Sequence, residues 1–109
     1  MNHVLARAAD LGKAMRETER FRALRAAEAA VMAAPDSVKL AEALGTLQKR
    51  IADAAAEGKD LEAGTKESLE KIASAAALDP LLRGLWKAQQ EFQGLVDEVS
   101  RTMLGELKP

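Results

Sequence analysis

The sequence predicts an all-α protein, and three observations lead to that class. Alanine, the residue with the strongest intrinsic preference for helix, accounts for 23 of the 109 residues. Apolar residues recur every three or four positions, and no run alternates between apolar and polar as a half-buried strand does. Prolines stand where helices would begin, at Pro35 and Pro80. We therefore expect one domain over residues 1–109, an antiparallel bundle of five helices in which the third and fifth are long and the fourth is short.

Two helices are predicted before Pro35, one over residues 3–16 and one over residues 19–33. If the apolar register of the first continued, it would place Arg22 and Arg25 on the apolar face. A new apolar set begins at Phe21 instead, so we expect the register to break near Thr18. A threonine side chain at that position can accept a backbone N–H and cap the second helix.

The third helix is expected to begin at Pro35 and to end near Gly58, because glycine readily adopts the left-handed conformation that terminates helices. The fourth helix is short and has a less distinct start. Asp60 and Thr65 are the residues able to cap it, and the sequence does not choose between them.

The fifth helix has the clearest start, with Asp79 as N-cap and Pro80 as its first residue, and it is expected to run to about Gly105. Its apolar positions follow one another at spacings of three and four without interruption. This pattern is typical of a seam that packs along a neighbouring helix, so we expect the fifth helix to be the main associating element. The predicted interface residues are Leu82, Leu85, Trp86, Gln89, Phe92, Val96, Val99 and Met103.

Two members of this seam leave alternatives open. Gln89 is its one polar residue, and it either pairs with a partner helix or faces solvent. Trp86 lies at the edge of the seam, where it either packs into the core or anchors an interface, since tryptophan is enriched among residues that dominate binding energy.

The sequence contains no cluster of catalytic or metal-binding type. It has no cysteine, which excludes disulfides, thiolate metal sites and Fe–S clusters held by cysteine. Its one histidine, His3, has no fixed acidic partner, and its serines have no base to activate them. We expect no enzyme activity, no cofactor, no metal and no small-molecule substrate.

The charge balance favours neither a nucleic acid nor a membrane as partner. The formal net charge is −1, no stretch approaches the ~20 apolar residues of a membrane span, and the N-terminus lacks the basic start of a signal peptide. Glutamates interrupt the one basic cluster, which indicates an ordinary solvated face rather than a nucleic-acid surface. We expect a cytoplasmic protein. The cluster comprises Arg16, Arg20, Arg22 and Arg25.

A pattern of helix starts, turns and apolar positions spans nearly the whole chain. It includes Glu17-Thr18-Glu19, Leu47-Gln48 in the proline-started third helix, the Glu57-Gly58 turn, Asp79-Pro80 and Ala88-Gln89-Gln90. In this pattern the chain resembles the YlbF/YmcA family of bacterial regulators, which includes the control-of-competence factors. It departs from the family in the inverted order of Pro35-Asp36 and in an aromatic residue displaced to Trp86.

The resemblance implies an all-α fold, self-association through long helices and action by complex formation. Some members join a complex that modulates RNA processing and development, and certain members of that complex hold Fe–S clusters through cysteines, which this chain lacks. We expect a regulatory or adaptor protein, a homodimer or higher oligomer, that binds an unidentified protein partner without touching nucleic acid or membrane. The alternative is a chaperone-like protein that shields a client, or a structural subunit of a larger assembly.

Overall fold

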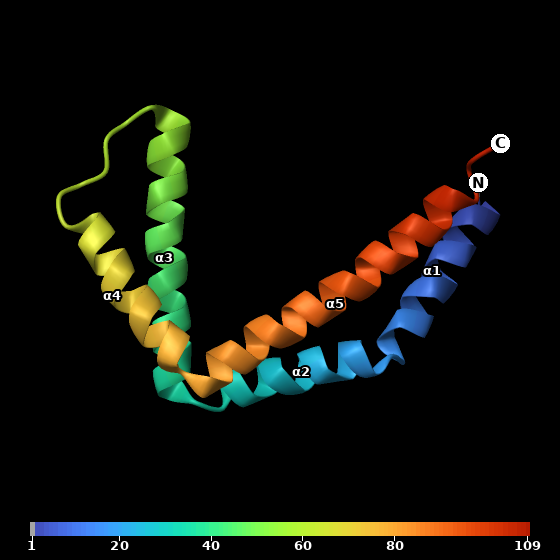
Figure 1. Cartoon of the computed structure of the whole chain (residues 1–109), viewed down its shortest axis with the longest axis horizontal. Coiled ribbons are helices and arrows are strands. Elements are labelled where there is room, and N and C mark those ends of the chain that lie inside the picture. Colours follow the sequence, from blue (N-terminus) through green and yellow to red (C-terminus); the bar gives the residue numbers. More distant parts are fainter. Residues whose placement is uncertain (1) are drawn as a thin grey trace. The chain divides into compact units, whose positions relative to one another are not determined.

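The structure, a computed structural model, describes residues 2–109 and is all-α, as the sequence predicts (Figure 1). Within these residues no strand forms, and the five helices are α1 (Asn2–Arg16), α2 (Glu19–Met32), α3 (Pro35–Glu57), α4 (Thr65–Leu78) and α5 (Pro80–Gly105). α3 and α5 have 23 and 26 residues, whereas α4 has 14, as many as α2. The packing of all five helices into one antiparallel bundle and one domain stays a prediction.

The chain divides into two compact units, and the division falls within α2 and α5. The first unit comprises residues 2–28 and Leu85–Pro109, which include α1, most of α2 and most of α5. The second unit comprises Ala29–Gly84, which include α3, α4 and the ends of the two shared helices.

Thr18 makes the break between α1 and α2, as predicted. Its Oγ1 accepts the backbone N–H of Phe21 at 3.2 Å and donates to the carbonyl oxygen of Met15 at 2.7 Å. One hydroxyl group therefore satisfies a carbonyl at the end of α1 and an N–H at the beginning of α2. These paired contacts give the chain a defined bend at Thr18.

The ends of α3 also match the prediction. Pro35 is at its beginning, where the missing N–H costs no hydrogen bond, and Gly58 closes it with a left-handed φ of 67°. The N–H of Gly58 donates to the carbonyl of Ala55, and that of Lys59 donates to the carbonyl of Ala54. These bonds satisfy carbonyls that the last turn of a helix leaves open.

The predicted cap of α4 is wrong, because neither Asp60 nor Thr65 provides it. Gly64, with a φ of 86°, is the N-cap residue and no side chain caps the helix, while Thr65 is the first helical residue and is buried. The carbonyl of Gly64 accepts the N–H of Ser68 at 2.9 Å. A left-handed backbone at the cap position favours glycine over a residue chosen for its side-chain oxygen.

In the second unit α3 and α4 pack side by side (Figure 1). The loop of residues 58–64 joins them, and the chain reverses direction in this loop. Leu47 of α3 and Ala76 of α4 are buried, with Val31 and Leu82 from the flanking ends of α2 and α5. The small alanine at the buried position of α4 is compatible with a close approach of the two helices.

Asp79 connects the starts of two helices within the second unit. Its Oδ2 accepts the hydroxyl of Ser37 at 2.6 Å, and its Oδ1 accepts the N–H groups of Leu81 and Leu82 at 2.9 and 3.2 Å. Asp79 is therefore the N-cap of α5, as predicted, and it also holds the first turn of α3. The Ser37 hydrogen bond, helped by the backbone bonds from Leu82 and Leu81 and opposed by desolvation, lowers the pKa of Asp79 below its ordinary value.

The first unit has a thinner core. Within residues 2–28 and 85–109, Ala88 is the one apolar side chain that is buried. Beside it Phe21 of α2 and Phe92 of α5 meet edge to face, with ring centroids 5.7 Å apart. This aromatic pair is a specific contact of α5 with α2 in the first unit.

Candidate functional site

The structure buries the predicted interface residues of α5 unequally. Leu82, in the second unit, has an exposed fraction of 1%, so it is a core residue of the chain itself. The other seven belong to the first unit, where half-buried and exposed residues follow one another along the helix. The half-buried ones are Leu85, Phe92, Val96 and Val99, and the exposed ones are Trp86, Gln89 and Met103. Their role as interface residues stays a prediction.

At the centre of α5 the buried position is Ala88, and its neighbour Gln89 is exposed. At this turn the buried residue therefore lies one position before the predicted seam, whereas the seam positions on either side, Leu85 and Phe92, are half-buried. Trp86 is 37% exposed and forms, with three glutamines, part of the lining of a hollow of about 550 Å³. The lining residues are Trp86, Gln89, Gln90, Gln93, Gly94 and Asp97. This lining combines the indole and three uncharged amides with one carboxylate, that of Asp97, and tryptophan is enriched at protein interfaces.

Further apolar side chains of the first unit are exposed. Met103 and Leu104, in the last turns of α5, are 51% and 60% exposed, and Val4 and Leu5 of α1 are also more than half exposed. Single exposed leucines are common on proteins, so the notable feature is that several apolar side chains are exposed in a unit that buries one.

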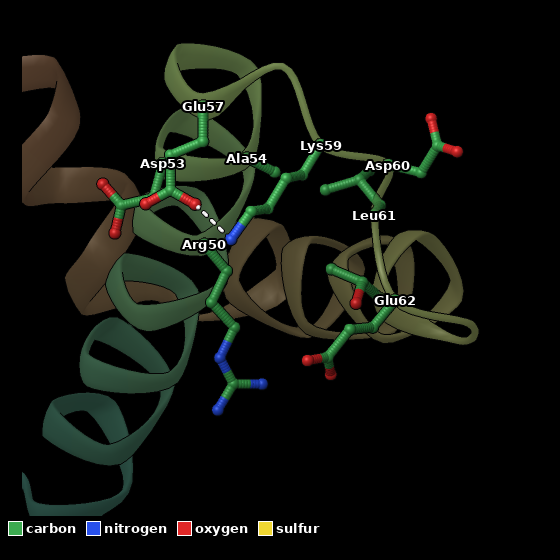
Figure 2. A pocket seen from close by; sticks show the side chains of 9 residues that line it. Arg50, Asp53, Ala54, Glu57, Lys59, Asp60, Leu61 and Glu62 are labelled. Atoms are coloured by element: carbon green, nitrogen blue, oxygen red, sulfur yellow. Dashed lines mark ion pairs between the residues drawn. The ribbon is translucent and has the colours of Figure 1, made fainter.

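A charged hollow of about 280 Å³ lies in the second unit where α3, the loop after it and the start of α4 meet (Figure 2). Nζ of Lys59 lies 3.2 Å from Oε2 of Glu57, while the carboxylate of Asp60 points away from this pair. The sequence did not predict this hollow, because it forms only where the loop of residues 58–64 lies against α3, and no local pattern specifies the path of that loop. Its charged residues are Arg50, Asp53, Glu57, Lys59, Asp60 and Glu62.

This charged hollow offers no metal site. In Figure 2 the carboxylates of Asp60 and Glu62 lie away from that of Glu57, and residues 2–109 contain no group of three or more His, Cys, Asp or Glu side chains that could hold a metal ion. Metal ions in proteins need several such ligands around one point. The neighbouring cations Arg50 and Lys59 also offset much of its negative charge.

A second hollow, of about 330 Å³, lies at the bend between α1 and α2 in the first unit. We call it the elbow hollow, and its lining carries four cationic side chains and one carboxylate. Arg22 pairs with Glu17 at 3.0 Å, and Arg25 pairs with Glu28, which lies outside the lining, at 3.4 Å. The lining residues are Lys13, Arg16, Glu17, Phe21, Arg22 and Arg25.

The cationic residues of the elbow hollow differ from the basic cluster identified in the sequence. Arg20 does not line it and instead lies 3.5 Å from Glu98 of α5, whereas Lys13, outside the cluster read from the sequence, does line it. The spacing of three between Lys13 and Arg16, and between Arg22 and Arg25, places each pair on one side of its helix. That spacing, with the break at Thr18, is the signal that could have identified the hollow.

In residues 2–109 no helix is long and apolar enough to cross a membrane. A comparison with family models finds that residues 4–108 match one described as control of competence regulator ComK, YlbF/YmcA. No curated protein sequence matches the chain. The family match confirms the resemblance read from the helix caps and apolar spacing.

Proposed function

Because the chain belongs to the YlbF/YmcA family of control-of-competence regulators, we propose that it is a non-catalytic regulatory protein of the cytoplasm that acts by binding other proteins. The match over residues 4–108 is the observation that carries the regulatory role. The adaptor mechanism rests on the surface of α5, where an indole and several apolar side chains are exposed.

The proposal includes self-association, with α5 packed along a helix of a second copy to complete an antiparallel bundle. Two features support it. The first unit buries few apolar side chains, and small cores are marginal in stability. A partner helix that covered Met103 and Leu104 would also remove their exposed apolar surface from water, which favours association.

Sedimentation velocity across a hundredfold range of protein concentration tests self-association. We expect a dimer or larger species at about 10 µM, a concentration at which a complex with a dissociation constant of about 1 µM or less is mostly formed. Met103→Glu places a charge on the predicted interface and should weaken association at least tenfold. Thr102→Glu adds the same charge one residue away, on an exposed position off the seam, and should leave association unchanged. A wild-type protein that stays monomeric throughout contradicts the proposal.

The chaperone-like alternative draws on the same exposed apolar side chains, because a client-shielding surface is also apolar. Affinity purification from the native cell distinguishes the adaptor function from the chaperone-like function. An adaptor retains a fixed set of folded partners, whereas a chaperone retains one unfolded client or many. If the chain is an adaptor, an excess of a reduced, unfolded model protein should not displace its partners from it.

A further inference from the structure

The elbow hollow differs from the rest of the chain in charge. Four of its six lining residues are cationic and one is anionic, in a protein whose formal net charge is −1. Among residues 2–109 neither Lys13 nor Arg16 forms an ion pair within 4.0 Å. The two helices therefore concentrate positive charge in one concave place on a protein that is otherwise slightly acidic.

The shape of the elbow hollow is held by bonds already described. Thr18 ties the end of α1 to the beginning of α2, and Phe21 on the hollow's wall is held by its edge-to-face contact with Phe92. A bend held in this way orders the binding groups before the ligand arrives, which lowers the entropy cost of binding.

The two ion pairs at the hollow are easily exchanged. The side chains of Arg22 and Glu17 are 65% and 76% exposed, and those of Arg25 and Glu28 are 70% and 45% exposed. Exposed pairs of this kind contribute little to stability, so an incoming carboxylate can replace Glu17 or Glu28 as a partner. A guanidinium group binds a carboxylate through two parallel hydrogen bonds, which makes arginine well suited to this recognition.

We propose that the elbow hollow between α1 and α2 binds an acidic segment of a partner protein, whose carboxylates pair with Lys13, Arg16, Arg22 and Arg25 and whose apolar side chain contacts Phe21. This inference rests on the proposed function, since it names the chemistry of the partner. A peptide fits better than a nucleic acid. The cations are confined to one hollow, and Phe21, the one aromatic residue there, is half-buried against Phe92 and so is not free to stack on a base.

Fluorescence anisotropy on the full chain provides the test. The probe is a labelled decapeptide of alternating glutamate and leucine, and its control replaces every glutamate by glutamine. We expect a dissociation constant on the order of 10–100 µM at low salt for the acidic peptide, weakened at least fivefold in ~0.5 M salt, and no measurable binding of the neutral peptide. Failure of the acidic peptide to bind overturns the proposal.

Charge reversals locate the site. Arg16→Glu should weaken peptide binding at least tenfold, whereas Arg101→Glu, the same change at an exposed position of α5, should weaken it less than twofold. Arg16→Gln is the milder variant if Arg16→Glu perturbs α1, and it should weaken binding about threefold while its circular dichroism spectrum stays that of the wild type. Equal losses from Arg16→Glu and Arg101→Glu mean that only net charge acts, which overturns the proposal.

Two further measurements distinguish other occupants. A labelled oligouridylate that binds more tightly than the acidic peptide and loses affinity in Arg16→Glu identifies a nucleic-acid site and overturns the proposal. Loss of self-association in Arg16→Glu identifies a second copy of this chain as the occupant, with the same consequence. If peptide binding fails while self-association through α5 persists, this inference is wrong and the proposed function stands.

Discussion

At the scale of single residues, Leu81 and Leu82 are neighbours with different surroundings. Leu82 is 1% exposed and Leu81 is 37% exposed, although both lie in the first turn of α5. We expect Leu82→Ala to lower the free energy of unfolding by about 3 kcal/mol, because it leaves a cavity in the second unit. Leu81→Ala is the matched control and should lower it by less than about 1 kcal/mol. Urea unfolding followed by circular dichroism measures both, and equal losses would show that Leu82 is not a core residue.

Asp79 should make the stability of the protein depend on pH in the acidic range. Its pKa is lowered in the folded state, chiefly by the hydroxyl of Ser37, so the carboxylate form binds protons less readily there than in the unfolded chain. The stability that Asp79 contributes is complete above the ordinary aspartate pKa of about 3.9 and is lost as the pH falls through the lower folded value. We expect Asp79→Asn to be less stable than the wild type at pH 7, with a difference that shrinks as the pH falls below about 4.

Urea midpoints between pH 7 and pH 3 measure this difference, and Ser37→Ala serves as a control. Removal of the Ser37 hydroxyl takes away the main cause of the lowered pKa of Asp79. The loss of stability between pH 7 and pH 3 that Asp79 causes should therefore be smaller in Ser37→Ala than in the wild type. A difference between the wild type and Asp79→Asn that stays constant over this range would contradict the assignment.

At the scale of elements, two glycines associated with α3 should respond to alanine with opposite signs. Gly58 has a φ of 67°, where an alanine is strained by about 1 kcal/mol or more, so Gly58→Ala should be destabilising. Gly45 lies inside α3, and a Cβ added there meets nothing within 4 Å. Gly45→Ala should therefore stabilise the protein by about 0.5–1 kcal/mol, since alanine favours helix over the unfolded state. Thermal melts compare the two, and a Gly58→Ala protein as stable as the wild type would refute the role of Gly58 as terminator.

Helix ends could be predicted from the sequence where a side chain makes the end. Thr18 and Asp79 act on N–H groups two or three residues away, so short-range chemistry identifies them. The start of α4 was missed because Gly64 acts through its backbone conformation, which the expected side-chain caps do not resemble. Ala88 is buried but is absent from the predicted interface residues, because alanine's small volume gives it little weight in an apolar pattern.

The candidate sites could be predicted only in part. The arginines near the bend were visible in the sequence, yet their separation into a hollow and an Arg20–Glu98 pair depends on where α5 lies against α2 in the first unit. The charged hollow after α3 depends on the path of residues 58–64. Contacts between segments distant in the sequence carry no local pattern, which is why helices were predicted better than the surfaces they form.

At the scale of the whole molecule, Phe92 reports whether assembly completes the core. It is half-buried in the chain, so Phe92→Ala should lower the free energy of unfolding by about 2 kcal/mol when the protein is dilute, less than the ~3–5 kcal/mol typical of a closed core. If α5 packs on a second copy, the loss should rise toward the upper range at high protein concentration.

Melting curves at two protein concentrations a hundredfold apart measure this effect. Phe21→Ala removes the same ring contact from the α2 side, away from the predicted seam, and its cost should not depend on concentration. A Phe92→Ala protein that folds and assembles like the wild type would show that α5 is not the main associating element.

Asp79 also determines where the chain tolerates added length. It is the single residue between α4 and α5, and its side chain is bonded both to the first turn of α5 and to Ser37. One extra residue there would separate α4 from α5 at the point where a single carboxylate bonds both to Ser37 and to the N–H groups of the first turn of α5, so both sets of bonds could not be kept. The loop of residues 58–64 carries exposed side chains, and longer loops cost little entropy. Inserted tags, spectroscopic probes and natural length variation should therefore be accommodated between α3 and α4 and excluded between α4 and α5.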